Sequence, residues 1–138
     1  VSHGFTLQTM RPTQITTTEA PAFGHLAQAT TANGTCYLGG VVGMKDGDII
    51  EGPAQMAQAF DNLRAVLKAC GSCPRNICSI NILLSPTCTE EEKTAFNAEW
   101  TKLLDGMEDG YRPARACWTA SLQPGFLIEM VNCVALQE

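Results

Sequence analysis

The fold is decided by residues 53–84, which read PAQMAQAFDNLRAVLKACGSCPRNICSINILL. Large apolar residues recur three or four positions apart in the first part of this stretch, and that period predicts an amphipathic helix over 53–70. The apolar stripe consists of Met56, Phe60, Leu63 and Leu67. Pro53 suits the first helical turn, because its missing N–H would have no partner there, and Gly71 suits the C-terminal stop.

The period changes from helical to alternating at the end of the same stretch. Apolar residues stand at every second position over 78–84, which predicts a buried strand. Its apolar face consists of Cys78, Ile80, Ile82 and Leu84. Further on, Thr89 followed by Glu92 forms a capping-box pattern, so a second helix is expected to begin there and to end at about Leu104. Its apolar side holds Phe96, Trp100, Leu103 and Leu104.

Turn signals mark the remaining strands. The dipeptide Asn33-Gly34 between residues 26–32 and 35–42 predicts a tight hairpin, because both residues tolerate positive φ. A second turn is expected at residues 46–48, and the turn at 123–125 separates two further expected strands, 114–121 and 126–136. Phe5 and Leu7 alternate with polar neighbours, which indicates an edge strand near the N-terminus.

The expected order is therefore strands, helix, strand, helix and two strands, an α+β fold in which two helices cover one face of a sheet. The chain is expected to form a single domain over residues 1–138, with 1–20 as a polar N-terminal extension or edge strand. Apolar residues such as Leu127 and Ile128 fall on both faces of the last strand. A subunit partner is the simplest cover for the second face of the sheet.

Charge and hydropathy exclude several classes of function. The net charge is −5 and the nine Lys and Arg residues are scattered, whereas a nucleic-acid site needs clustered cations, so no nucleic-acid partner is expected. No stretch approaches the roughly 20 apolar residues of a membrane span. The N-terminal residues do not show an apolar segment after a basic start, so a secretory signal is not expected. The cytosol is the expected compartment, with a mitochondrial destination left open.

The seven cysteines are expected to be reduced thiols, most of them small core residues. The spacing of Cys70 and Cys73, with Cys78 and Cys88 downstream, is similar to that of a redox or zinc motif. A zinc site commonly uses two close pairs of ligands, and the second close pair is missing here. No metal site is therefore expected.

Several segments, taken in order, resemble the Rid family, also called the YjgF or L-PSP family. Pro113-Ala114-Arg115 matches its most recognisable tripeptide. The other matching segments are Gly24 with Gln28-Ala29, residues 55–63 running on to Gly71, Asn97, and Pro124 with residues 127–129, which resemble the family's closing hairpin. The match covers roughly residues 20–136, and the order and spacing of its pieces are specific.

The resemblance implies a homotrimer with three clefts between subunits, each binding a small 2-imino or 2-oxo acid. It implies hydrolysis of reactive enamines and imines, of the 2-aminoacrylate or 2-iminobutanoate type, to 2-oxo acids and ammonia. Arg115 would grip the substrate carboxylate and Glu129 would place the attacking water. No metal or organic cofactor is expected.

The residue chemistry supports these two roles and leaves alternatives open. A guanidinium binds a carboxylate through two parallel hydrogen bonds, but Arg115 could equally form a structural ion pair at an interface. Glu129 shares strand parity with Leu127, Val131, Cys133 and Ala135, so partial burial is expected. It could orient or deprotonate water, or pair with Arg115 or with an arginine of another subunit.

Four further residues are candidate contacts to the substrate. Cys117 has the strand parity of Arg115, and its alternative role is a small space-filler. Asn97 could contact ligand, position the neighbouring subunit, or simply be solvated. His25 and Gly39 stand in segments that match the family's substrate site, although a lone histidine is more often structural.

The sequence also departs from the family pattern. Leu26 and Ala27 replace a tyrosine and a serine, residues 39–41 replace Ser-Gly-Gln, and the segment between Arg115 and Glu129 is one residue shorter. One wall of the cleft is therefore more apolar. The substrate could be a bulkier imine, or the protein could bind small carboxylates without turnover. Endoribonuclease activity, attached to some relatives, is disfavoured by the acidic charge.

Overall fold

A computed structural model describes residues 11–138, so the expected strand at Phe5 and Leu7 lies outside the described residues. The helices are α2 (Ala54–Ala69) and α3 (Glu90–Leu104), with short 3₁₀ turns at Pro74–Asn76 and Glu108–Gly110. The strands are β1 (Thr13–Ile15), β2 (Ala29–Ala32), β3 (Thr35–Leu38), β4 (Val41–Val42), β5 (Met44–Lys45), β6 (Asp48–Ile49), β7 (Ile77–Leu84), β8 (Ala114–Thr119) and β9 (Ile128–Leu136).

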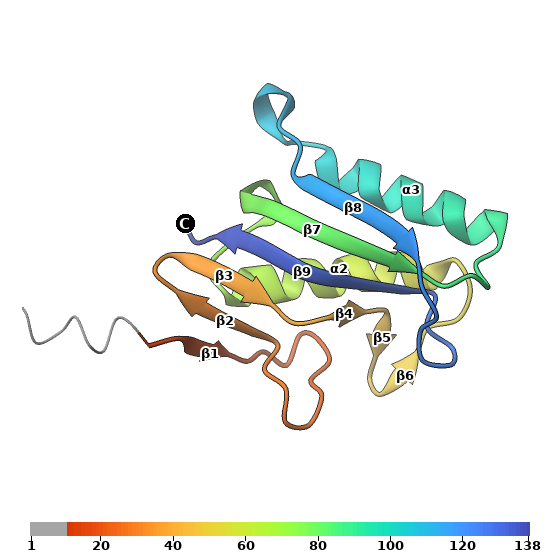
Figure 1. Cartoon of the computed structure of the whole chain (residues 1–138), viewed down its shortest axis with the longest axis horizontal. Coiled ribbons are helices and arrows are strands. Elements are labelled where there is room, and N and C mark those ends of the chain that lie inside the picture. Colours follow the sequence, from red (N-terminus) through yellow and green to blue (C-terminus); the bar gives the residue numbers. More distant parts are fainter. Residues whose placement is uncertain (1–10) are drawn as a thin grey trace, which may run out of the picture.

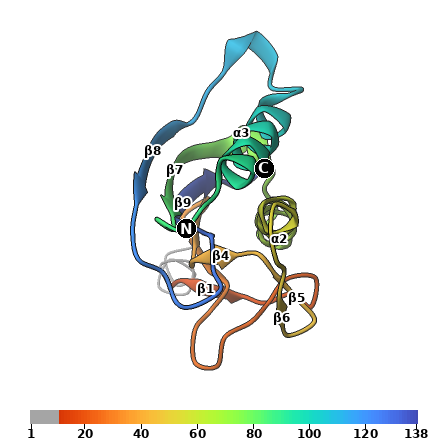
Figure 2. The ribbon, with the colours of Figure 1, turned by 90° about the vertical axis from the view of Figure 1, so that its right-hand side faces the viewer.

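One mixed sheet and two helices form two layers, which confirms the expected α+β fold. The strand order is β1-β2-β3-β9-β7-β8, with β4 pairing with the free edge of β9 beyond β3. Both helices lie on the same side of this sheet, and the other side carries no helix (Figures 1 and 2). Strand β8 runs parallel to β7 because α3 carries the chain back across the sheet between them.

Both helices have the ends that their sequences predict. Thr89 and Glu92 make the reciprocal capping box at the start of α3. Helix α2 begins after Pro53 and ends before Gly71, which adopts φ 75°. The hairpin between β2 and β3 is also confirmed, because Asn33 and Gly34 turn the chain with φ 51° and 77°.

The core lies between the sheet and the two helices. Its largest buried side chains come from α2, β7 and β9: Met56, Phe60, Leu63, Leu67, Ile77, Ile80, Ile82, Ile128 and Met130 are all at most 1 % exposed. Phe96 of α3 packs against Phe60 with ring centroids 6.0 Å apart. The apolar stripe expected on α2 is therefore the centre of the core, which fixes the helix on the sheet.

Two strand parities expected from the sequence are wrong, because each strand carries an extra residue. Cys78 is exposed although it was expected to face the core with Ile80, since the pairing of β7 with β9 shifts at Cys78. On β9, Asn132 adopts φ 54° and the register shifts again. Glu129 therefore faces away from the helices, whereas Cys133 beyond the bulge faces them.

The last two strands are not a hairpin, which corrects the expectation for residues 114–136. Strand β7 lies between β8 and β9 and pairs with both of them. Residues 120–127 therefore cross the end of β7, as Figure 1 shows. The turn expected at residues 123–125 lies within this crossing and is closed by the bond from Phe126 N–H to the Gln123 carbonyl, at 3.1 Å. This order decides the geometry of the candidate site, because β7 then relates the positions of Arg115 and Glu129.

The face of the sheet opposite the helices is open in the single chain and carries several exposed apolar side chains. Its most exposed large side chains are Tyr37, Trp118 and Leu136, which are 49 %, 48 % and 52 % exposed. Val131 and Val134 share that face by their strand register. We call this surface the open face.

Gln55 fixes the loop that leads into β9. Its side chain is fully buried and donates to the carbonyl oxygens of Ile50, at 2.7 Å, and Gly125, at 3.0 Å. Its Oε1 accepts from the backbone N–H of Leu127 at 2.6 Å. One amide thus joins the start of α2 to the segment just before Glu129.

Replacing Gln55 with alanine is expected to lower the free energy of unfolding by about 3 kcal/mol or more, because three buried backbone groups lose their partner. The matched control is Gln58→Ala on the same helix, whose amide bonds only Asn62 at 2.9 Å. That change is expected to cost about 1 kcal/mol or less. Urea denaturation of both variants is the measurement, and equal losses would contradict the role of Gln55.

Candidate functional site

Glu129 lies on the open face beside a pair of glycines. In the register of the sheet it stands opposite Leu83 of β7 and Val42 of β4, and its side chain is half-buried. A Cβ atom added to Gly40 would collide with Glu129 Oε2, so any larger residue there would force the carboxylate to move. The ion pairs found within residues 11–138 do not include Glu129. The carboxylate is therefore left for a ligand, water or another chain.

Arg115 lies on edge strand β8, and its guanidinium packs on aromatic rings of α3. The guanidinium carbon is 4.6 Å from the ring centroid of Trp100 and 5.7 Å from that of Phe96. Stacking of this kind restrains the side chain while its N–H groups keep their donor capacity. The ion pairs and hydrogen bonds of the described chain leave those donors unused. The guanidinium can therefore donate two parallel hydrogen bonds to a carboxylate from outside the chain.

The single chain holds Arg115 and Glu129 on opposite faces of the sheet. Arg115 stands opposite Ile80, which points into the core beneath the helices. Glu129 stands opposite Leu83, three positions further along β7, so its side chain leaves from the other face. Sequence reasoning could not fix this relation. The register shows that the side chains of Arg115 and Glu129 in one chain leave from opposite faces of the sheet.

Of the other candidate residues, Cys117 and Asn97 lie on the elements that carry and flank Arg115, whereas His25 lies in a loop. Cys117 stands opposite Ile82, so it faces the same way as Arg115 and is exposed on the edge strand. Asn97 is exposed on α3, one turn from Trp100. His25 is exposed in a turn closed by the bond from Leu26 N–H to the Phe23 carbonyl, at 2.8 Å.

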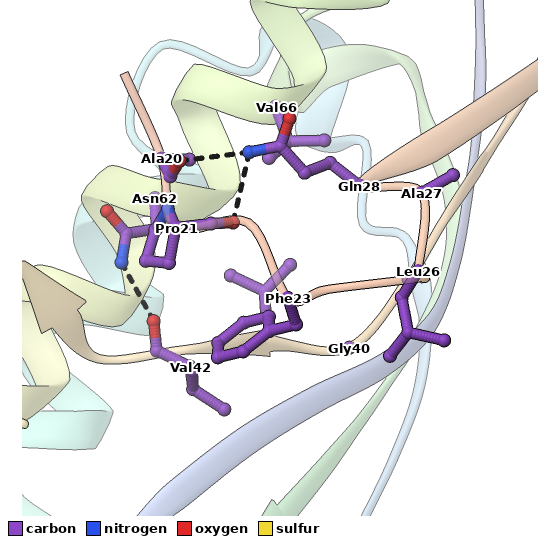
Figure 3. Close-up of a pocket in the computed structure, with 12 residues that line it drawn as sticks. Ala20, Pro21, Phe23, Leu26, Ala27, Gln28, Gly40, Val42, Asn62 and Val66 are labelled. Carbon is purple, nitrogen blue, oxygen red and sulfur yellow. Dashed lines mark hydrogen bonds between the residues drawn. The ribbon is translucent and has the colours of Figure 1, made fainter. Parts of the chain in front are cut away.

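A cavity of about 180 Å³ adjoins the backbone next to Glu129. Figure 3 shows the side chains of Phe23, Leu26 and Val42 gathered around Gly40. The full lining is Ala20, Pro21, Phe23, Leu26, Ala27, Gln28, Gly39, Gly40, Val41, Val42, Asn62 and Val66. No charged residue is among them, and most of the lining is apolar. Among the residues expected from the sequence to contact substrate, Gly39 is the one that lines this cavity.

The comparisons with known proteins identify the family. The family model described as Endoribonuclease L-PSP matches residues 17–137. The chain is 32 % identical to the 2-iminobutanoate/2-iminopropanoate deaminase of Mus musculus, covering 89 % of this chain and 90 % of the relative. It is 31 % identical to the mitochondrial protein mmf1 of Schizosaccharomyces pombe, covering 91 % and 76 %.

The chain belongs to the Rid family. Its fold is similar to that of a hypothetical protein from Giardia lamblia, with a TM-score of 0.85 and 36 % identity, covering 93 % of this chain and 100 % of the other. The resemblance seen in the sequence is therefore confirmed at the level of family and fold.

Two features of this Rid protein's site were not found from the sequence. The stacking of Arg115 on two aromatic rings was not predicted, because Trp100 and Phe96 were assigned only to the apolar side of a helix. The approach of Gly40 to Glu129 was missed as well, although a glycine pair that interrupts an apolar strand signals close approach of another group. Leu26, which stands where the family has tyrosine, is 71 % exposed at the rim of the cavity.

The thiols of this Rid protein are all free, and four are buried. Burial raises the pKa of Cys70 and of Cys133 to about 12, and it also raises the pKa of Cys36 and Cys88. Within residues 11–138 no group of three or more metal-ligating side chains lies in position to hold an ion. The same residues contain no helix long and apolar enough to cross a membrane.

Alkylation is expected to separate exposed from buried thiols. Because the folded state raises the pKa of Cys70 and Cys133 to about 12, both are protonated and shielded at pH 8, and unfolding returns their pKa to about 8.5. Iodoacetamide at pH 8 should therefore label exposed Cys78 and Cys117 first, and Cys70 and Cys133 only in denaturant. Mass spectrometry of the digested protein is the measurement. Equal labelling rates in the folded protein would contradict the burial of these thiols.

Proposed function

We propose that this protein hydrolyses reactive 2-imino acids to 2-oxo acids and ammonia, in clefts between the subunits of a homotrimer. The observation that carries the proposal is Arg115, a guanidinium stacked on Trp100 with no acidic partner in the described chain. A substrate carboxylate supplies that partner through two parallel hydrogen bonds. The imine deaminase activity in the name of the mouse relative fits the same chemistry.

A site shared between two copies of the chain follows from the orientation of Arg115 and Glu129. Arg115 and Glu129 leave from different faces of one sheet, so a site that uses both takes each from a different subunit. The open face gives such an assembly an apolar surface to bury, including Tyr37 and Trp118, each about half exposed in the single chain. Sedimentation should then give about three times the 14.8 kDa of the chain.

The reaction needs one water molecule and no redox change. Arg115 holds the carboxylate, and water adds to the C=N carbon while the π electrons move to nitrogen. Glu129 accepts a hydrogen bond from that water and takes its proton, which then reaches the leaving nitrogen. The hydroxyl of the carbinolamine formed in this way gives up its proton as the C=O bond forms and the C–N bond breaks. The nitrogen, which has then taken up both protons of the water, leaves as ammonia, and a 2-oxo acid remains.

A coupled assay tests the proposal directly. A PLP-dependent threonine dehydratase generates 2-iminobutanoate in the presence of semicarbazide, which traps the imine as a semicarbazone. The protein is expected to suppress semicarbazone formation by hydrolysing the imine first. Semicarbazone formation at the rate seen without the protein would overturn the proposal.

The second candidate is a protein that binds small carboxylates without turnover. It is favoured by Leu26 and Ala27, which bring no hydroxyl group to the wall beside Gly40. It predicts saturable binding of 2-oxobutanoate in a calorimetric titration together with no imine hydrolysis. The absence of heat in that titration would count against both candidates.

Two finer points complete the proposal. Ribonuclease activity is not proposed, because the net charge is −5 and the cations are scattered.

The cytosol is the expected compartment, and the mitochondrion is the alternative because the Schizosaccharomyces pombe relative is mitochondrial by name. Microscopy of the full-length protein in its own cells distinguishes the two.

A further inference from the structure

The cavity next to Gly40 takes no part in the proposed addition of water. It is joined to the site by Gly40 and Val42, which line it. Gly40 touches the Glu129 carboxylate, and Val42 stands opposite Glu129 in the register of the sheet, so both side chains share a face. A substrate whose reacting carbon lies at Glu129 therefore has this cavity within reach of its own side chain.

We propose that this cavity binds the side chain of the substrate, and that the preferred substrates are 2-imino acids with unbranched or branched aliphatic side chains longer than ethyl. This inference rests on the proposed imine hydrolysis and names its substrate class. The volume of about 180 Å³ suits such a chain, since an apolar cavity of about 150 Å³ stays dry and takes up benzene.

The side-chain amides of the lining already have hydrogen-bond partners within the chain, so the cavity favours an apolar group over a polar one. Gln28 Nε2 donates to the carbonyl oxygens of Ala20 at 2.9 Å and Pro21 at 3.0 Å (Figure 3). Asn62 Nδ2 donates to the carbonyl oxygens of Val42 at 2.8 Å and Met44 at 2.9 Å. A hydroxyl, amide or charge entering the cavity loses its water without a replacement partner.

The same bonds hold the cavity open before the substrate arrives. Gln28 anchors the segment that carries Phe23 and Leu26, and Thr17 N–H also donates to Gln28 Oε1, at 2.7 Å. Asn62 anchors the other wall to α2 through β4. A cavity formed in advance needs no ordering on binding, so each methylene that enters contributes in full to specificity.

The test measures kcat/KM against side-chain length. An L-amino acid oxidase, with oxygen and catalase, generates the imines of 2-aminobutyrate, norvaline and norleucine, which carry ethyl, propyl and butyl groups. Suppression of semicarbazone formation gives kcat/KM for each imine. We expect about a fourfold rise per added methylene. A flat or falling series with measurable turnover would overturn the inference and leave the proposed function standing, whereas no turnover of any imine would overturn both.

Opposed substitutions of one lining residue provide the matched variants. Val66 of α2 is 3 % exposed and lines the cavity. Val66→Ala should raise the ratio of butyl to ethyl kcat/KM at least about threefold, and Val66→Leu should lower it by a similar factor. Leu63→Val, on the same helix but outside the cavity, should leave that ratio unchanged. Shifts in the same direction for both Val66 variants would contradict the inference, because destabilisation alone cannot move a ratio in opposite directions.

Discussion

Replacing Arg115 with alanine is expected to reduce kcat/KM for 2-iminobutanoate by at least about 100-fold. Each hydrogen bond between charged partners contributes about 1.5–3 kcal/mol, and the guanidinium fork offers two of them to the carboxylate. The loss should appear in the coupled semicarbazide assay, with KM and kcat determined separately. The melting temperature should change little, because Arg115 is exposed and its guanidinium forms no ion pair within residues 11–138.

Two further variants distinguish the effect of the two parallel hydrogen bonds from the effect of the positive charge alone. Arg115→Lys keeps the charge but cannot form two parallel bonds, so an intermediate loss of about 10-fold is expected. Arg112→Ala is the matched control, because Arg112 is an exposed arginine three residues earlier whose recorded bond goes to the Tyr111 carbonyl at 2.8 Å. Wild-type kinetics in Arg115→Ala would remove the central support of the proposed function.

The layers of the fold were predictable because their signals are local. A capping box needs only Thr89 and Glu92, and the hairpin at Asn33 needs only two residues that tolerate positive φ. The bulges at Cys78 and Asn132 were not predictable, since one extra residue reverses the facing of all that follow and leaves no mark on composition. The false hairpin could not be recognised locally, because the expected strands 114–121 and 126–136 leave a connection of four residues, within the usual two to five for a hairpin.

The candidate site was predictable only as a set of residue types. Arg115 and Glu129 stood out as charges in apolar strands, but their relative facing depends on β7 lying between β8 and β9. That order is a long-range property of the sheet, which no local pattern encodes. The contact between the Arg115 guanidinium and the Trp100 ring likewise requires α3 to pack beside β8. The roles of Asn97, Cys117, His25 and Gly39 remain predictions.

Replacing Glu129 with glutamine is expected to lower kcat for 2-iminobutanoate by about 10²- to 10⁴-fold, with little change in KM. The amide keeps the size of the side chain beside Gly40 but cannot take a proton from water. The carboxylate anchor at Arg115 is untouched, so substrate binding persists. Glu99→Gln on α3 is the matched control, and a loss confined to KM would show that Glu129 binds substrate instead of activating water.

The two inactive variants, combined, decide whether one site is built from two copies of the chain. In a mixed oligomer, a cleft with Arg115 from a Glu129→Gln subunit and Glu129 from an Arg115→Ala subunit contains both functional groups. Random assembly of equal amounts should give about a quarter of the clefts this composition. Co-expression of the two variants should therefore restore activity that neither variant shows alone. No restoration, with mixed oligomers confirmed by mass spectrometry, would contradict the shared site, and the opposite facing of Arg115 and Glu129 on the sheet would then need a different explanation.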